Sequence, residues 1–227
     1  MQKVITVDGP SGSGKGSLCQ LLAKQLGWSL LDSGALYRIV GLAAERRGVD
    51  FADAKALATL AAGLKVRFEP GVLGEPARVI LDDEDVSSAV RAETTGSLAS
   101  QVAVHGAVRD ALLGLQREFA GARGLIADGR DMGTVVFPQA PLKIYLTASA
   151  EERANRRYKQ LKDAGQSVNL AALLEDIQTR DERDMNRELA PLKPAADALI
   201  IDSSVLAIED VLKQVLAAIK VSPISAL

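Results

Sequence analysis

A glycine-rich segment near the N-terminus carries the residue types and spacing for phosphate chemistry. Residues 9–15 read GPSGSGK and match the phosphate-loop pattern G-x-x-x-x-G-K. Glycines at this spacing let the backbone curl until successive N–H groups point at one anion, and the Lys15 ammonium can reach the outer phosphates of a nucleotide. A β-branched run at residues 4–7 precedes the segment, and leucines at helical spacing follow it. This order favours a phosphate loop over a glycine-rich surface turn.

The metal ligands of such a loop are less regular in this sequence. The pattern expects Ser or Thr directly after Lys15 as a Mg²⁺ ligand, but Gly16 stands there and Ser17 comes next. Either Ser17 contacts the phosphates or Mg²⁺, or the metal is held largely through water. Asp128 ends an apolar run and is placed where a second strand would present a carboxylate to the metal; the alternative is a capping or turn aspartate. The residues expected to bind the phosphates of a nucleoside triphosphate are Gly9, Ser11, Gly12, Ser13, Gly14, Lys15, Gly16 and Ser17.

Arginines recur on two predicted helices. They are Arg153, Arg156 and Arg157 on one helix, and Arg180, Arg183 and Arg187 on the other. Guanidinium forks suit phosphate oxygens, so an enzyme that brings two phosphorylated substrates together needs several of them. A phosphate acceptor is already ionised and needs no general base, whereas a hydroxyl acceptor would need a carboxylate such as Asp32 or Asp131. The alternative for both helices is an ion-paired surface.

The elements that must position these residues alternate between strands and helices. Short apolar runs at 125–127, 142–146 and 198–201 are separated by helix-like stretches, which predicts an α/β fold with a parallel sheet. The polar-apolar alternation at 65–68 and 78–81 departs from this pattern. It predicts a β-hairpin within a small antiparallel insertion.

Composition excludes several classes of protein. The 227 residues include 27 Lys+Arg and 29 Asp+Glu, and this near-balance argues against a dedicated nucleic-acid binder. One cysteine and one histidine exclude a disulfide framework and make a His-based metal site or relay unexpected. No apolar run approaches the roughly 18 residues of a membrane span, and the first one is too short for a signal peptide. We expect a cytoplasmic protein that works as a monomer.

Taken together, the motifs resemble those of the bacterial cytidylate kinase family. The segments that carry the resemblance are residues 9–17, 31–38, 126–134 and 180–184, and the likeness continues in order through 191–197. The resemblance implies transfer of the γ-phosphoryl group of ATP to CMP or dCMP. It also implies a single P-loop kinase domain over residues 1–227, with three layers: a parallel central sheet and helices on both faces.

By the same resemblance, this domain has three parts. The core would span residues 1–62, 99–150 and 190–220, and a monophosphate-binding region with the β insertion would span about 32–98. A helical lid would span about 151–188.

The resemblance also carries over individual residues. Those implied to bind the monophosphate substrate are Ser33, Ser100, Arg109, Arg130, Asp131, Arg180, Asp184 and Arg187. Arg38, which directly follows residues 33–37, is expected to join them because its guanidinium group suits phosphate oxygens. Those implied to act on the transferred phosphoryl group are Lys15, Arg130, Arg153, Arg157 and Arg187. Ser17 and Asp128 remain the expected contacts of Mg²⁺.

The chemistry of cytosine suggests how two of these residues select the base. A carboxylate such as Asp131 can accept the N4 hydrogen of cytosine, while Arg109 can donate to N3 or O2. Uracil presents an acceptor at position 4 and a donor at N3, so the same two side chains would meet mismatched partners.

Two other functions stay open on the sequence. One is a phosphate-loop kinase that acts on a small hydroxyl acceptor. The other is a nucleotide-dependent switch without transfer chemistry, against which the number of arginines in motif positions argues. The guanine-reading Asn-Lys-x-Asp tetrad of GTPases is absent.

Overall fold

The computed structural model describes residues 2–69, 78–163 and 165–226. The chain divides into two compact units. The first, called the core unit below, comprises Met1–Asp32 and Gln116–Leu227; the second, called the inserted unit, comprises Ser33–Leu115. Each is described by itself.

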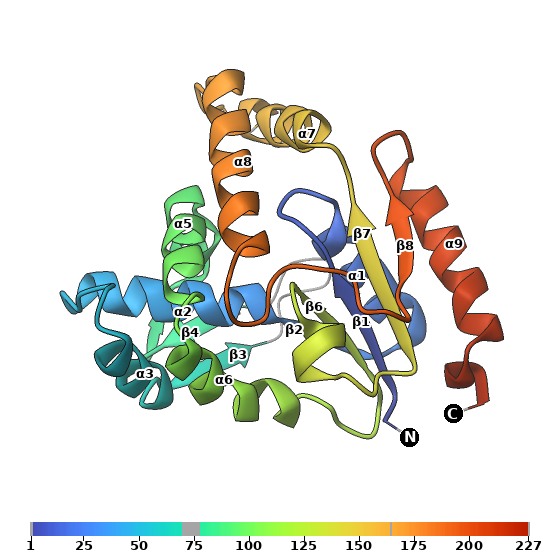
Figure 1. Cartoon of the computed structure of the whole chain (residues 1–227), viewed down its shortest axis with the longest axis horizontal. Helices are drawn as coiled ribbons and strands as arrows, with labels where there is room; N and C mark the ends of the chain where they lie inside the picture. The colour runs from blue at the N-terminus through green and yellow to red at the C-terminus, as the bar shows by residue number, and fades with distance from the viewer. Residues whose placement is uncertain (1, 70–77, 164, 227) are drawn as a thin grey trace. The chain divides into compact units, whose positions relative to one another are not determined.

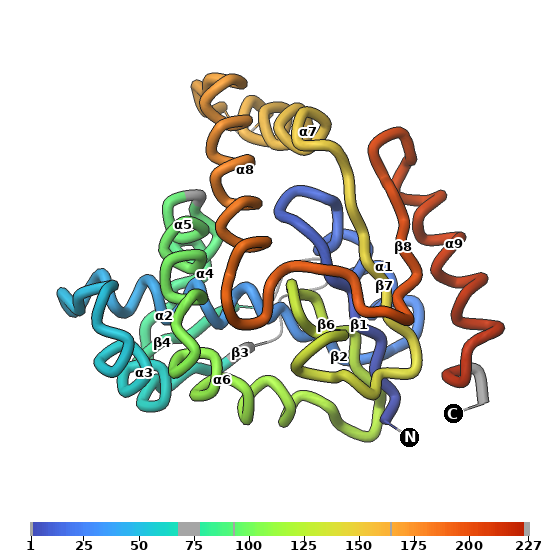
Figure 2. The backbone as a smooth tube through the Cα atoms, in the orientation of Figure 1, coloured from blue at the N-terminus to red at the C-terminus, as the bar shows by residue number. Residues whose placement is uncertain are grey.

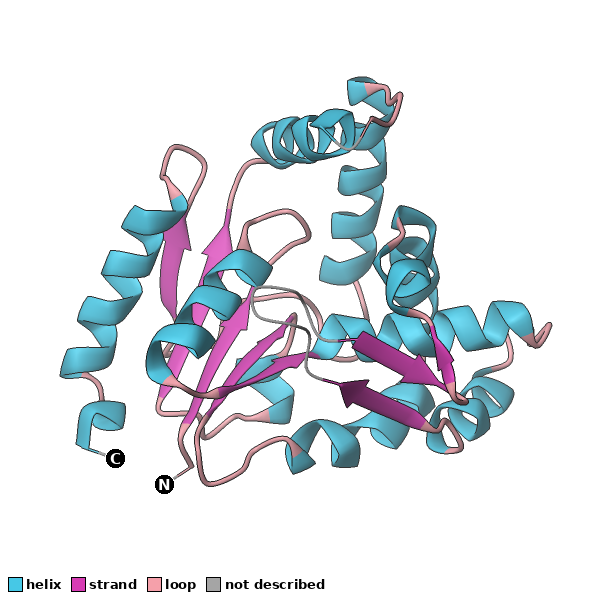
Figure 3. Ribbon diagram, turned by 180° about the vertical axis from the view of Figure 1, so that it is seen from behind, coloured by secondary structure: helices cyan, strands magenta, loops and turns pink. Residues whose placement is uncertain are grey.

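The core unit contains a parallel sheet. Within the described residues it has five strands: β1 (Val4–Asp8), β2 (Ser29–Asp32), β6 (Leu125–Gly129), β7 (Leu142–Thr147) and β8 (Leu199–Asp202). Their order is β2-β6-β1-β7-β8 and every neighbouring pair is parallel, as Figures 1 and 3 show. The first strand of the chain therefore lies in the middle of the sheet, and the segment that follows it leaves from the carboxyl edge, where α/β sheets bind their ligands.

Two helices cover one face of this sheet. These are α1 (Lys15–Leu26) and α9 (Ile208–Val221), and their buried residues pack with Ile5 and Val7 of β1 in one apolar core. Because successive side chains of a strand point to opposite faces, Thr6 and Asp8 face the other side. There β1 packs against η1, a single π-helical turn over Met132–Val136. The predicted parallel α/β fold, with helical elements on both faces, is confirmed.

A pair of helices follows β7 in the chain. They are α7 (Ala150–Asp163) and α8 (Leu170–Met185), which pack against each other. In Figure 2 the chain rises from β7 to α7, which runs across the top of the view, and returns downward through α8. The Asn169 side chain caps α8 by accepting hydrogen bonds from two backbone N–H groups of its first turn. This pair covers most of residues 151–188, and the action of that segment as a lid stays a prediction. A short 3₁₀ turn, η2 (Pro223–Ala226), follows α9.

The inserted unit combines helices with a small antiparallel sheet. Its helices are α2 (Ser33–Arg46), α3 (Ala54–Ala62), α4 (Ser87–Arg91), α5 (Glu93–Val102) and α6 (Gly106–Glu118), the last of which continues into the core unit. Gly41 permits a close crossing of α2 and α5, because a Cβ there would lie 2.8 Å from Leu98 Cβ.

The sheet of the inserted unit has the order β3-β4-β5. These strands are β3 (Val66–Glu69), β4 (Arg78–Leu81) and β5 (Glu84–Asp85). The predicted hairpin strands are confirmed, while their connecting segment, 70–77, lies outside the described residues. The sequence did not predict β5. The turn before β5 places Asp82 and Asp83 at positive φ, and the acidic run of residues 82–85 forms exposed ion pairs with arginines, for example Arg67–Asp83 at 2.7 Å.

In the part of the chain that the structure describes, no helix combines the length and apolar character that crossing a membrane requires.

Candidate active site

The glycine-rich segment joins β1 to α1 as an open loop. Gly12 and Gly14 have φ values of 77° and 93°, in the left-handed region that favours glycine. Gly9 is required for a second reason: a Cβ there would lie 2.0 Å from the Leu146 carbonyl oxygen. The N-cap position of α1 is Gly14, which offers no side-chain cap. The first N–H groups of α1 are thus available to an anion.

Lys15 folds back onto this loop. Its Nζ donates a hydrogen bond to the Pro10 carbonyl oxygen at 2.7 Å, and the side chain is buried. Burial, followed by the nearby positive charge of Arg130, lowers the pKa of Lys15 to about 8. A phosphate at this position would supply the negative charge that favours the ammonium form.

Asp128 lies beside the loop at the point where the sequence has glycine in place of a hydroxyl residue. A Cβ on Gly16 would be 3.8 Å from Asp128 Oδ2. Burial raises the pKa of Asp128 to about 6; Lys15 opposes this rise, and Asp32, its register partner on β2, adds to it.

These oxygen donors fit Mg²⁺ that arrives with a nucleotide. Among the described residues, no three His, Cys, Asp or Glu side chains form a metal cage. Mg²⁺ bound with a nucleotide needs none, because it keeps several waters and takes one or two protein oxygens together with phosphate oxygens. The Asp128 carboxylate next to the loop, with the hydroxyl residue Ser17 on the first turn of α1, is such a donor set.

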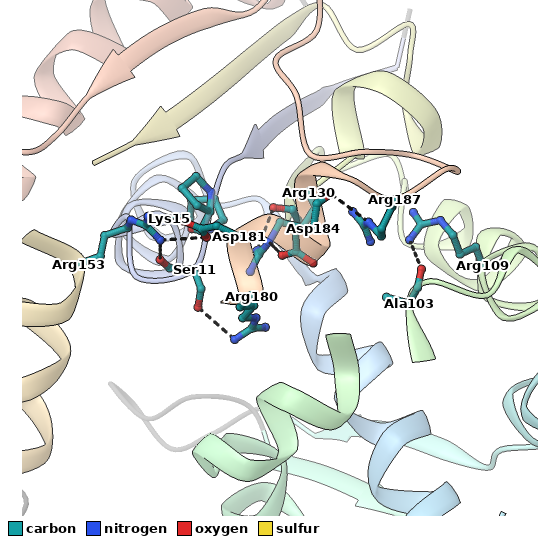
Figure 4. A network of polar contacts seen from close by, with 12 residues as sticks. Ser11, Lys15, Ala103, Arg109, Arg130, Arg153, Arg180, Asp181, Asp184 and Arg187 are labelled. Atoms are coloured by element: carbon teal, nitrogen blue, oxygen red, sulfur yellow. Dashed lines mark hydrogen bonds and ion pairs between the residues drawn. The ribbon is translucent and has the colours of Figure 1, made fainter. Parts of the chain in front are cut away.

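Arginines from α7 and α8 meet the loop at one residue. Arg153 of α7 donates to the Ser11 carbonyl oxygen at 3.0 Å, and Arg180 of α8 donates to Ser11 Oγ at 3.2 Å (Figure 4). Arg153 is held by two further partners, the Ala148 carbonyl oxygen at 3.0 Å and the carboxylate of Asp181, which receives two hydrogen bonds. The loop and both helices are therefore joined by guanidinium groups.

The end of α8 carries a second cluster. Arg130 Nε donates to Asp184 Oδ2 at 2.9 Å, and Arg187 Nε donates to the Asp184 carbonyl oxygen at 3.3 Å (Figure 4). Burial by itself would raise the pKa of Asp184, but Arg130, Arg187 and Arg180 lower it below its usual value. Asp184 is thus an ionised, buried carboxylate among three arginines.

The remaining arginines of α7 are arranged differently from one another. Arg157 donates to Gln160 of its own helix at 3.4 Å. Arg156 lies at the loop: a Cβ on Gly14 would be 4.0 Å from its Nη1, and that atom also donates to Ser203 Oγ at 3.2 Å. The family resemblance pointed to Arg153 and Arg157 ahead of Arg156. Helical spacing does not choose between Arg156 and Arg157, because both lie within one turn of Arg153.

Four predicted substrate residues lie in the inserted unit. Arg38 donates to the backbone carbonyl oxygens of residues 90 and 92 at 3.0 and 2.9 Å, next to the end of α4. Arg109 lies over the Tyr37 ring, 5.4 Å from its centroid, and donates to the carbonyl oxygen of residue 103. Ser33 and Ser100 are buried, and Ser100 Oγ has no hydrogen-bond partner among the described residues.

Asp131 is the N-cap residue of η1 and is 2% exposed. The N–H groups of Met132 and Gly133 donate to Asp8 at the end of β1. Sequence reasoning named neither Asp8 nor Asp181 as a site residue. Two features of the sequence could have pointed to them. Asp8 is a charged residue at the end of an apolar strand, and Asp181 is the acidic residue next to Arg180.

Comparison with known proteins assigns the family. The model of the family described as cytidylate kinase matches residues 5–221. A cytidylate kinase of Pseudomonas syringae pv. tomato is 60% identical over 222 residues, which cover 98% of this chain and 97% of the relative. A cytidylate kinase of Pseudomonas fluorescens (strain SBW25) is 58% identical with the same coverage. The crystal structure of an uncharacterized protein from Eubacterium ventriosum shares the fold, with a TM-score of 0.51, 10% identity, and coverage of 97% of this chain and 99% of that one. Because the family model and relatives of this identity span almost the whole sequence, the chain belongs to the cytidylate kinase family and is a phosphotransferase.

Proposed function

We propose that this member of the cytidylate kinase family transfers the γ-phosphoryl group of ATP to CMP and dCMP, with ADP and CDP or dCDP as products. The observation that best supports the proposal is the meeting of Arg153 and Arg180 at Ser11 of the phosphate loop. Two guanidinium groups from different helices reach the loop that would hold the triphosphate, which is an arrangement suited to a phosphoryl group between two anionic substrates.

The chain's own residues act mainly by position and charge. The loop N–H groups and Lys15 hold the phosphates of ATP, and Arg130, Arg153, Arg157 and Arg187 neutralise the charge that spreads over the equatorial oxygens during transfer. Because the acceptor is a phosphate oxygen that is already ionised, no side chain has to remove a proton from it.

Mg²⁺ is the proposed cofactor, carried in with ATP. Asp128 and Ser17 would hold it, directly or through water. When bound, the metal ion polarises the phosphoryl group and neutralises part of its charge.

Base and sugar selection is assigned to the remaining predicted residues. Asp131 accepts from the N4 amino group of cytosine and Arg109 donates to N3 or O2, so that uracil leaves both side chains mismatched. Asp184 is assigned to the sugar together with Arg180, whose guanidinium group also reaches Ser11 Oγ of the phosphate loop. The residues left to hold the monophosphate are Ser33, Arg38 and Ser100.

The helices α7 and α8 form the proposed lid of a single kinase domain. The other proposed parts are the core at residues 1–62, 99–150 and 190–220 and the monophosphate-binding region at about 32–98. Closure of the lid after both substrates bind would exclude water, which would otherwise hydrolyse ATP. We propose that the protein works in the cytoplasm as a monomer with nucleotide substrates. A nucleic-acid partner is not expected, because the formal net charge is −2.

A coupled assay of ADP release across all nucleoside monophosphates, with and without Mg²⁺, tests the proposal. CMP and dCMP are expected to be turned over far faster than UMP, AMP and GMP, and only with the metal ion. A Lys15→Met variant is the matched control, and it is expected to fold but to lose turnover. ADP release that does not depend on CMP would contradict the transfer reaction and the gating of hydrolysis.

A further inference from the structure

A buried carboxylate joins the end of β1 to the segment that carries Arg130 and Asp131. Asp8 is 4% exposed, and its two oxygens accept hydrogen bonds from Met132 N and Gly133 N, each at 2.8 Å. These are the first two N–H groups of η1, which its own turn cannot satisfy. Asp8 thus caps η1 from a neighbouring strand.

The N-cap position of η1 itself is occupied by Asp131. An aspartate at an N-cap commonly accepts hydrogen bonds from the N–H groups of the first turn. The Asp131 side chain makes no such cap bond; Asp8 accepts both instead. The backbone beside Asp131 is thus supported by a different carboxylate, that of Asp8.

Close packing restricts this segment further. A Cβ on Gly133 would lie 2.9 Å from Thr6 Oγ1 and 3.3 Å from Asp8 Oδ2, which is tighter than ordinary contact. Burial raises the pKa of Asp8 to about 7, and the hydrogen bonds from Gly133 and Met132 oppose the rise. A buried carboxylate is costly unless it is hydrogen-bonded. The carboxylate and the two N–H groups consequently stabilise one another.

We propose that Asp8 is a positioning residue for base selection: it holds the N–H groups of Met132 and Gly133 and so fixes the direction in which the adjacent Asp131 carboxylate meets the pyrimidine. This inference rests on the proposed function, because it requires Asp131 to recognise cytosine.

The isosteric change Asp8→Asn tests the contact. A carboxylate presents two acceptor oxygens, whereas an amide presents one acceptor and one donor, so one of the two N–H groups loses its partner. The expected result is a fall of about fivefold in the ratio of kcat/KM for CMP to kcat/KM for UMP, with the KM for ATP unchanged.

A double-mutant cycle with Asp131→Ala shows whether the effect passes through Asp131. In the Asp131→Ala background, Asp8→Asn is expected to leave the CMP to UMP ratio unchanged. Thr6→Val is the matched control on the same face of β1. Thr6 Oγ1 is buried and has no hydrogen-bond partner among the described residues, so this change is expected to leave the ratio at the parent value.

The outcomes separate the two claims. If Asp131→Ala leaves the ratio unchanged, the recognition of cytosine by Asp131 is wrong, and the inference fails with it. Suppose instead that Asp131→Ala lowers the CMP to UMP ratio. The positioning role of Asp8 alone is then overturned if Asp8→Asn leaves the ratio unchanged, or if Asp8→Asn lowers it equally with and without Asp131→Ala.

Should Asp8→Asn fail to fold, NMR of the parent protein gives the answer. The amide protons of Met132 and Gly133 are expected to move downfield together as the pH rises through about 7 and Asp8 ionises. Amide protons of Met132 and Gly133 that do not follow the titration of the Asp8 carboxyl carbon, measured in the same samples, would contradict the contact.

Discussion

Arg153 and Asp181 form an ion pair between α7 and α8, and the same guanidinium group donates to the Ser11 carbonyl oxygen of the phosphate loop. Both side chains are largely buried, at 4% and 12% exposure. The ion pair thus joins α7 to α8, and through Arg153 it also connects both helices to the loop that would hold ATP.

Removal of the negative partner leaves the buried Arg153 charge without its carboxylate. Asp181→Asn is expected to lower the free energy of unfolding by about 3 kcal/mol, since breaking one side of a buried pair leaves the other charge uncompensated. Urea denaturation measures the change. The exposed neighbour Glu182 provides the control: Glu182→Gln is expected to stay within about 0.5 kcal/mol of the parent. Equal effects of the two changes would refute this account of the pair.

ATP binding is expected to be coupled to protonation of Lys15. The pKa of Lys15 is about 8 in the unliganded chain, and a bound triphosphate raises it, so above pH 8 binding must take up a proton. ATP affinity should then fall as the pH rises beyond about 8. Calorimetry at pH 8.5 in two buffers with different ionisation enthalpies measures the uptake. Lys15→Met should abolish the difference between the buffers, and its persistence in that variant would exclude Lys15 as the group.

The enzyme is expected to need a higher Mg²⁺ concentration at acidic pH, because Asp128 becomes protonated. The pKa of Asp128 is about 6, above the ordinary aspartate value, so below pH 6 the metal must displace a proton from the carboxyl group. The Mg²⁺ concentration for half-maximal activity should rise as the pH falls through about 6. Asp128→Asn should need about tenfold more Mg²⁺ at pH 7.5 and lose the pH dependence that the parent shows. A variant with the parent's metal dependence would remove Asp128 from the site.

Two glycines should respond in opposite directions to the same substitution. Gly9→Ala places a methyl group against the Leu146 carbonyl oxygen at a left-handed φ of 147°, so it should destabilise the protein by about 3 kcal/mol or more and abolish ATP binding. Gly114 lies inside α6 with nothing within 4 Å of an added Cβ. Gly114→Ala should raise stability by about 0.5–1 kcal/mol. Thermal unfolding compares the two variants, and a tolerated Gly9→Ala would contradict the close approach of β7 to the loop.

Hydrophobic periodicity and glycine spacing in the sequence determined much of the secondary structure of this protein. The β-branched run before residues 9–15 and the leucines after them sufficed to predict a buried strand, a glycine-rich loop and the helix that follows it; the central place of that strand in the sheet came only from the structure. These are local patterns in which each residue's conformation depends mainly on its neighbours in sequence. The short strand β5 escaped prediction because two residues carry no detectable alternation.

The tertiary structure decided which charged side chains meet. Arg153, Arg156 and Arg157 are equivalent by helical spacing, yet their contacts differ. Arg153 donates to the Ser11 carbonyl oxygen, Arg156 Nη1 lies 4.0 Å from the position of a Cβ on Gly14, and Arg157 donates to Gln160. The contact of Asp8 with Met132 and Gly133 joins residues 124 and 125 positions apart in the chain. Such pairings depend on strand order and helix docking, which bring distant segments together and leave no periodic trace in the sequence.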